Sequence, residues 1–106
     1  MWANRDGAWD HNLCRVARSY GFKVTPRSRA SWQGINTALK KSFAIVGYVE
    51  PCDEEEHWSV VVALNEERIV LNDPWNGPQF TLRWADFFRR WRQCNRELII
   101  LHYPRT

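Results

Sequence analysis

The amino-acid sequence predicts an α+β fold, with a largely antiparallel sheet of about four strands and two to three helices. Three segments carry a single apolar stripe at helical spacing, and several others are short apolar or β-branched runs of strand length. The runs at 57–64 and 68–72 are separated by only three polar residues, which indicates a hairpin and therefore antiparallel pairing. A chain of 106 residues has the size of one domain, so a single domain over residues 1–106 is expected.

The helices are predicted from capping residues and apolar stripes. Asp10 can cap a helix that runs to Tyr20, and Gly21 permits the left-handed backbone conformation that ends it. Ser31 is the next capping residue, for a helix that extends to about Lys41. The third predicted helix carries a stripe of aromatic side chains, namely Trp84, Phe87, Phe88 and Trp91.

The strands are predicted from short runs with apolar residues on both faces, which are typical of strands covered on two sides. Pro74 ends the second strand of the hairpin, because proline has no N–H to donate to a neighbouring strand. A short extended segment is expected at 23–25, followed by a basic loop. The predicted strands lie at 43–49, 57–64, 68–72, 79–82 and 98–103.

The register of the hairpin decides whether His57 and Asp73 can meet. With a three-residue loop, Leu64 pairs with Arg68. Asp73 then lies opposite Ser59 and diagonal to His57, on the same face of the sheet. Diagonal Cβ atoms are roughly 7 Å apart, which allows an imidazole to hydrogen-bond a carboxylate. A two- or four-residue loop would place the two side chains on opposite faces, and the spacing alone also fits a rim histidine and an unrelated strand stop.

The hairpin is part of a longer pattern. A strand of valines opens with His57, a second strand ends with Asp73 before a proline, and the chain continues with Gly77, Leu82, Phe87 and Trp91. This pattern resembles the papain-like cysteine peptidases that process the double-glycine leaders of bacteriocins, and residues 7–49 resemble the middle segment of that family. The resemblance implies a fold like one half of a papain-like peptidase, with His57 as the general base and Asp73 as the residue that orients it.

The nucleophile is the part of the family pattern that the sequence does not match. The family carries its thiol in a Gln…Cys-Gly segment upstream of the matching part, and these 106 residues contain no such segment. Cys14 lies about one turn inside its predicted helix, where a helix terminus lowers a thiol pKa little. It is a candidate nucleophile or a partly buried structural thiol. Cys52 lies on a predicted loop, and Cys94 has no functional argument. We therefore expect a divergent member that lacks the nucleophile segment.

The resemblance implies a non-hydrolytic, peptidase-like domain that binds a peptide or protein partner and retains the His57–Asp73 pair. One alternative is an active or truncated cysteine peptidase that uses Cys14 or a thiol supplied from upstream or by a partner. Another is a small structural or interaction module. The predicted binding residues are Ser59, on the face of His57, and Trp75, which can wall the histidine pocket or simply pack.

Composition excludes several other classes. The three cysteines are odd in number and widely spaced, which indicates free thiols in a reducing compartment and hence the cytoplasm. They lack the paired short spacing of zinc sites, so neither a metal nor a cofactor is expected. No apolar run is long enough to cross a membrane, and the first residues do not form a signal peptide. The net charge of +3 is mild and residues 54–56 are acidic, which disfavours nucleic acid as a partner.

Self-association is also expected. Without the nucleophile helix, the sheet face that carries the catalytic histidine would lack a cover, and a large exposed apolar face is unusual in a monomer. A twofold homodimer would cover it with one self-complementary patch, unless the N-terminal segment folds over it instead. The residues of this face are His57, Ser59, Val61, Ile69 and Leu71.

Overall fold

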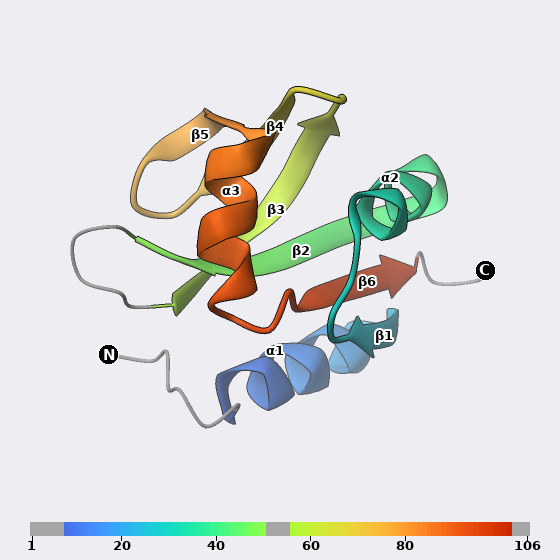
Figure 1. Ribbon diagram of the computed structural model, residues 1–106. Helices are drawn as coiled ribbons and strands as arrows, with labels where there is room; N and C mark the ends of the chain where they lie inside the picture. The colour runs from blue at the N-terminus through green and yellow to red at the C-terminus, as the bar shows by residue number, and fades with distance from the viewer. Residues whose placement is uncertain (1–7, 51–55, 103–106) are drawn as a thin grey trace.

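The computed structural model describes residues 8–50 and 56–102, which form an α+β fold as predicted (Figure 1). No helix in these two ranges is long and apolar enough to span a membrane. In chain order the elements are α1 (Ala8–Ser19), β1 (Lys23–Arg27), α2 (Trp32–Lys41), β2 (Ser42–Val49), β3 (Glu56–Leu64), β4 (Arg68–Asp73), β5 (Gly77–Arg83), α3 (Trp84–Arg92) and β6 (Leu98–His102).

The sheet has six strands in the order β1-β6-β2-β3-β4-β5, and every neighbouring pair is antiparallel. The prediction of about four strands is therefore wrong, and the difference lies at the two edges. β1 continues through Pro26 to Arg27, because an edge strand tolerates a proline that an inner strand would not. β5 begins at Gly77, whose φ of 93° is readily adopted only by glycine, and pairs with β4.

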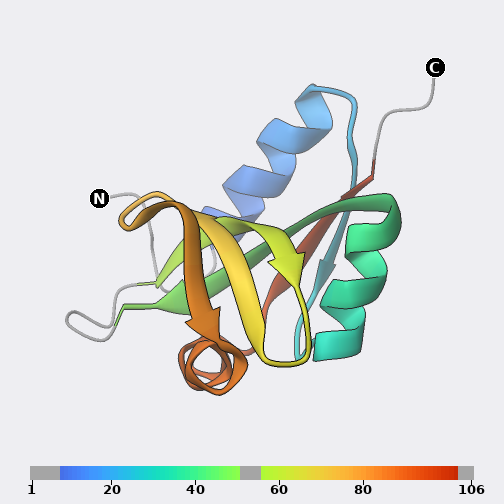
Figure 2. The same ribbon diagram turned by 90° about the horizontal axis from the view of Figure 1, so that it is seen from above.

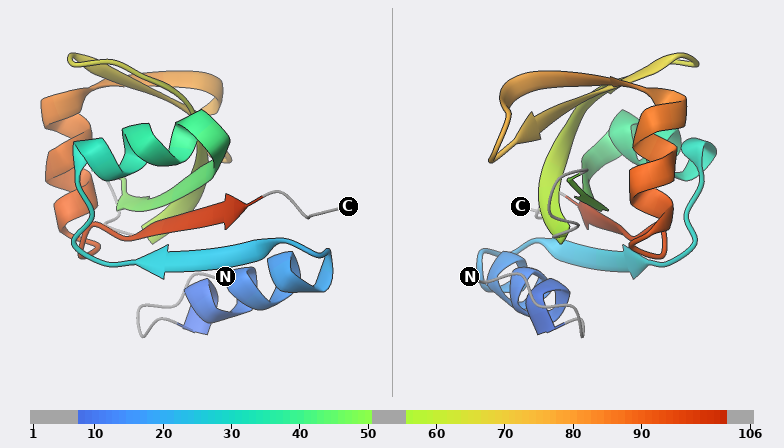
Figure 3. Two further views of the ribbon diagram at one scale, coloured as in Figure 1. Left: turned by 90° about the vertical axis from the view of Figure 1, so that its right-hand side faces the viewer. Right: turned by 60° about the vertical axis from the view of Figure 1, so that its left-hand side comes forward.

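The helices cover both faces of this sheet. Figures 2 and 3 show α2 and α3 on one face and α1 on the other. On the α2–α3 face, the side chains of both helices pack on alternate residues of the strands. The main core on that face comprises Ile35, Ala38, Ala44, Val46, Tyr48, Val61, Ile69, Leu71, Phe87, Trp91 and Leu98. The smaller core under α1 comprises Cys14, Ala17, Val24, Ile45, Trp58 and Ile99.

The face that carries His57 is covered, contrary to the prediction. Phe87 and Trp91 of α3, together with Ile35 of α2, pack on it and are fully buried. All five residues of this face are buried as well, namely His57, Ser59, Val61, Ile69 and Leu71. The homodimer was predicted because this face was expected to be uncovered. It therefore stays a prediction without that support.

The helix ends largely follow the sequence signals. The helix α1 begins at Ala8, so Asp10 lies within its first turn and is not the predicted cap. Its end is as predicted, because Gly21 has a φ of 93° and its N–H donates to the carbonyl of Arg18 at 3.0 Å. The predicted cap of α2 is confirmed, since the Ser31 hydroxyl accepts from the N–H of Gly34 at 3.1 Å.

The β3–β4 hairpin aligns His57 and Asp73 as predicted, but its turn and the pairing next to the turn differ from the prediction. Leu64 pairs with Ile69, so the predicted pairing of Leu64 with Arg68 is wrong. The side chain of Asn65 accepts from the N–H groups of Glu67 and Arg68, both at 2.8 Å, and this wider turn encloses one more residue. Alone, the longer turn would separate His57 and Asp73.

A bulge in β3 restores the register. The pairing shifts by one residue between Val61 and Ala63, and beyond this point Val60 pairs with Asn72. The extra residue in the strand compensates for the extra residue in the turn. His57 and Asp73 therefore project from the same face.

Candidate active site

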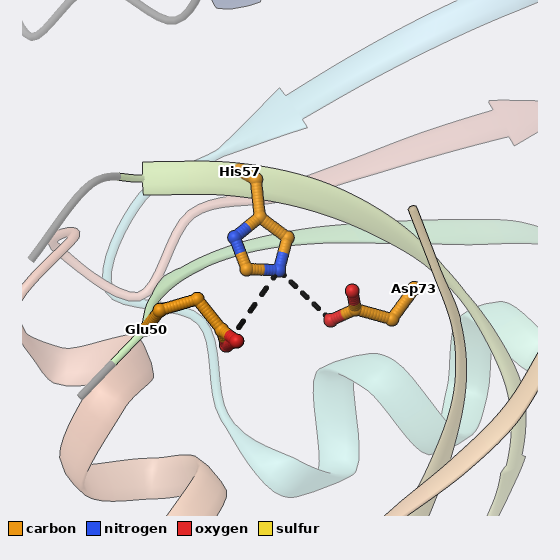
Figure 4. Close-up of side chains that lie close together, drawn as sticks. All are labelled: Glu50, His57 and Asp73. Carbon is orange, nitrogen blue, oxygen red and sulfur yellow. Dashed lines mark hydrogen bonds and ion pairs between the residues drawn. The ribbon is translucent and has the colours of Figure 1, made fainter. Parts of the chain in front are cut away.

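His57 and Asp73 form a buried, hydrogen-bonded pair at one end of the sheet. His57 is the second residue of β3, and Asp73 is the last residue of β4. Nε2 of His57 lies 2.8 Å from Oδ2 of Asp73. Figure 4 shows the two side chains pointing toward each other. The two residues are 2% and 3% exposed, so little solvent competes with this bond. The predicted placement of the pair on one face, within hydrogen-bonding reach, is confirmed.

The carboxylate of Asp73 accepts four hydrogen bonds from the surrounding residues. Its Oδ1 accepts from the backbone N–H of Trp75 at 2.7 Å and of Asn76 at 2.8 Å. Its Oδ2 accepts from the hydroxyl of Tyr48 and from His57. Burial acts to raise the pKa of Asp73, but these four hydrogen bonds outweigh it and lower the pKa to about 2. The carboxylate is therefore ionised at neutral pH.

This lowered pKa predicts an acid-sensitive contribution to stability. The unfolded chain has an ordinary aspartate pKa of 3.8 and the folded chain one of about 2, so folding favours the ionised form above pH 4. As the pH falls through 4 to 2, about 2 kcal/mol of the free energy of unfolding should be lost. Urea unfolding at a series of pH values measures this loss. Asp73→Asn is the control and should lack this component; equal pH slopes in both proteins would contradict the assignment.

Tyr48 is a third member of the hydrogen-bonded network around Asp73, and it was not predicted from the sequence. It pairs directly with His57 across β2 and β3, and the two ring centroids are 4.6 Å apart. Its hydroxyl lies 2.8 Å from Oγ of Ser59 and donates to Asp73. Burial, followed by the hydrogen bond to Asp73, raises the pKa of Tyr48, so the phenol keeps its proton as a donor. The missed signal was the alignment of 43–49 with 57–64, which places a tyrosine opposite the histidine.

Glu50 and Arg90 form a second, outer layer of charge. Oε2 of Glu50 lies 4.0 Å from Nε2 of His57 and accepts from Arg90 at 3.2 Å. Oε1 of Glu50 accepts from the side chain of Asn76 at 3.0 Å. The side chain of Arg90 is only 15% exposed and neutralises Glu50. The sequence could not indicate this contact, because it joins Glu50, which follows β2, to α3 across 40 residues.

A metal is a poor fit to this cluster. Within the described ranges, Glu50, His57 and Asp73 are the residues that could hold an ion, with ligand atoms within 4.8 Å of one another. These atoms are already engaged, since His57 and Asp73 bind each other and Glu50 binds Arg90. A cation would have to replace the proton between His57 and Asp73 and compete with the Arg90 guanidinium. The donor set favours a hydrogen-bonded network.

The pairing with Asp73 determines which nitrogen of His57 is basic. An ionised carboxylate can only accept, so Nε2 carries the proton, and in the neutral ring the lone pair lies on Nδ1. Nδ1 is buried, and no described residue hydrogen-bonds to it. The ring is thus oriented by Asp73 with its basic nitrogen unengaged, which is the arrangement that a general base requires.

The predicted binding residues lie close to this pair. Ser59 is 2% exposed and is part of the network through Tyr48. Trp75 is 64% exposed, and its ring centroid lies 6.4 Å from that of His57. Ser59 therefore supports the pair from within, whereas Trp75 is placed where a ligand could touch it. Binding by either residue stays a prediction.

The structure does not bring the described cysteines to His57. Cys14 is buried in the core under α1 with Trp58, and successive residues of a strand point to opposite faces, so Cys14 and His57 lie on different sides of the sheet. Cys94 is half-buried in the turn after α3, and Nδ1 of His57 has no bond to it. Cys52 lies outside the described residues.

Comparison with known proteins identifies the fold. No protein-family model matches the sequence, and no curated protein matches it. Among solved structures, the chain is similar to a crystal structure from Bacillus anthracis named as a C39-like peptidase, with a TM-score of 0.70 and 15% sequence identity. The chain has a C39-like fold. The match covers 89% of this chain and 58% of the other, so the chain spans little more than half the length of that protein.

At this level of identity the likeness concerns the C39-like fold alone. It agrees with the peptidase-like fold that the sequence pattern implied, although with six strands instead of about four. Divergent membership of the bacteriocin-processing family, and the catalytic roles of His57, Asp73 and Cys14, stay predictions.

Proposed function

We propose that this chain is a peptidase-like domain that binds a peptide or protein partner and does not hydrolyse it on its own. The observation that carries the proposal is the state of His57: its ring is held by Asp73, while Nδ1 meets no thiol among the described residues. A base and its orienting residue without a nucleophile contribute little to amide cleavage. In this proposal the domain retains the base of a thiol peptidase site, His57, and the residue that orients it, Asp73.

A cleft on the α1 face of the sheet, on the other side from the His57 side chain, supports the binding role. It has a volume of about 510 Å³, within the range of ligand-binding clefts. Ser59 and Asp73 border it, and most other lining residues are apolar. Such a surface suits the side chains of a peptide segment better than a small charged ligand. The remaining lining residues are Leu13, Ile45, Trp58, Val60, Asn72, Pro74, Gly77 and Pro78.

The unengaged Nδ1 also favours one second candidate, which is hydrolysis with a thiol that comes from elsewhere. In a thiol peptidase the imidazole receives the proton of the cysteine on one nitrogen while its orienting residue holds the other. Asp73 occupies Nε2 and leaves Nδ1 available for that role. Cys52, which precedes His57 by five residues, or a cysteine of a partner protein could supply the thiol.

An activity assay separates the two candidates. We expect the purified chain to release product from a fluorogenic peptide containing a double-glycine segment no faster than the His57→Ala variant does. The matched set Cys14→Ser, Cys52→Ser and Cys94→Ser should behave in the same way. Cleavage that disappears in His57→Ala and in one of these serine variants would overturn the non-hydrolytic proposal and name the nucleophile.

Alkylation of the thiols gives a second readout. A cysteine activated by His57 would react with iodoacetamide at pH 6, well below the ordinary thiol pKa of about 8.5. We expect no such labelling, and no change in labelling when His57 is replaced by alanine. Labelling at pH 6 that requires His57 would favour the enzyme.

A further inference from the structure

A second cleft lies at the other end of β2 from the His57 site. Its volume is about 430 Å³, and it is formed where α2 passes over the ends of β1, β2 and β6. Ser42 borders it and begins β2, whereas Tyr48 lies six residues further along. At about 3.3 Å per residue, the two sites are roughly 20 Å apart. The lining residues are Arg27, Gln33, Gly34, Thr37, Ala38, Lys41, Ser42, Ile100 and His102.

One wall of this cleft is a polar stripe of α2. Gln33, Thr37 and Lys41 follow one another at intervals of four residues, so their side chains lie in one line along the helix. Gly34 and Ala38 lie beside this line and are small. A Cβ at Gly34 would meet its nearest neighbour at 3.6 Å, so the glycine is not required by packing there and leaves room in the floor.

The sheet end of the cleft is held in place by His102. The register aligns Ser42 with His102, and Lys23 pairs with His102 on its other side. Nδ1 of His102 lies 3.2 Å from Oγ of Ser42, and Nε2 lies 3.2 Å from Oγ1 of Thr25. Both ring nitrogens therefore have a hydroxyl partner, and the imidazole is fixed as part of the wall.

The cleft has a cation at each end. Arg27 pairs with Leu98, and His102 lies four residues further along β6, where it pairs with Ser42, the residue that follows Lys41. Four residues of strand span about 13 Å. None of the described lining residues is acidic. Within 8–50 and 56–102, neither Arg27 nor Lys41 forms an ion pair. The two charges are therefore available to a ligand.

We infer that this cleft binds an extended acidic peptide segment whose two carboxylates are four residues apart. In an extended chain, residues i and i+4 point to the same side and are about 13 Å apart, which matches the separation of the two cationic ends. The small side chains and Ile100 provide an apolar floor for the residue between them. The hydroxyl and amide groups of Thr37 and Gln33 can pair with the peptide backbone. The inference does not depend on any chemistry at His57.

The test uses the peptide acetyl-Glu-Ala-Val-Ala-Glu-amide and its counterpart with both glutamates replaced by glutamine. We expect saturable binding of the first peptide to the full chain in an NMR titration, with the largest shifts at Thr37, Ser42 and His102. Binding should weaken as salt is added. The glutamine peptide should bind at least about tenfold more weakly, since it retains shape and loses both charges.

Matched variants make the result specific. Arg27→Ala and Lys41→Ala should each weaken binding about threefold, and the double variant about tenfold, as expected for separate exposed ion pairs. Lys40→Ala removes the same charge from the same helix but does not line the cleft, so it should leave binding unchanged. Equal weakening by Lys40→Ala, equal binding of the glutamine peptide, or equally tight binding of free glutamate would each overturn the inference.

Discussion

Asp73→Ala is expected to lower the free energy of unfolding by about 3–5 kcal/mol, because it leaves a buried network without its common acceptor. Four donors end on this carboxylate: the Tyr48 hydroxyl, Nε2 of His57, and the backbone N–H groups of Trp75 and Asn76. The two side-chain donors are buried, so their hydrogen bonds are not exposed to solvent that could replace the carboxylate. Urea unfolding followed by tryptophan fluorescence measures the loss.

Two matched variants test the reason for this loss. Asp73→Asn keeps an oxygen for the backbone N–H groups, so we expect a smaller loss of about 1–2 kcal/mol. Its amide would donate to Nε2 of His57 and move the ring proton to Nδ1, which the ¹⁵N chemical shifts of the imidazole report. Tyr48→Phe removes one donor and should cost about 1 kcal/mol. If Asp73→Ala were no worse than Tyr48→Phe, the carboxylate would not be the centre of the network.

The His57–Asp73 pair was predictable because it depends on local signals. The turn and the bulge that align the two residues were not predictable. A strand of valines that opens with a histidine, a short turn and an Asp-Pro strand end are visible in the sequence, and they placed His57 and Asp73 together. The bulge between Val61 and Ala63 has no such signal, since valine suits either side of it. It was the wider turn set by Asn65 that made a compensating residue necessary.

The parts of the site that were missed involve contacts between distant segments. Tyr48 meets Asp73 only after β2, β3 and β4 have paired, and Glu50 meets Arg90 only after α3 has packed on β2. The same limit explains the wrong expectation of an uncovered sheet face. The aromatic stripe of α3 was recognised, but the face of the sheet that it covers depends on the return of the chain after β5.

Trp91→Ala is expected to cost about 3–5 kcal/mol, as is usual for deletion of a fully buried large aromatic side chain. Trp91 is 0% exposed in the core between α3 and the sheet, and it contacts the rings of Trp84, Phe87 and Phe88. Its indole N–H also donates to the carbonyl of Glu97 at 2.9 Å, which fixes the turn that leads into β6. Deletion therefore leaves a cavity and removes the hydrogen bond to the Glu97 carbonyl.

Trp75→Ala is the matched control, because it removes the same side chain from a position that is 64% exposed. It should change the free energy of unfolding by no more than about 0.5 kcal/mol. Urea unfolding followed by far-ultraviolet circular dichroism suits this comparison, since it does not depend on the deleted fluorophore. A loss below about 1 kcal/mol for Trp91→Ala would contradict its place in the core. In that event the cover that α3 provides over His57 would have to be reconsidered, because Phe87 and Trp91 are the residues that provide it.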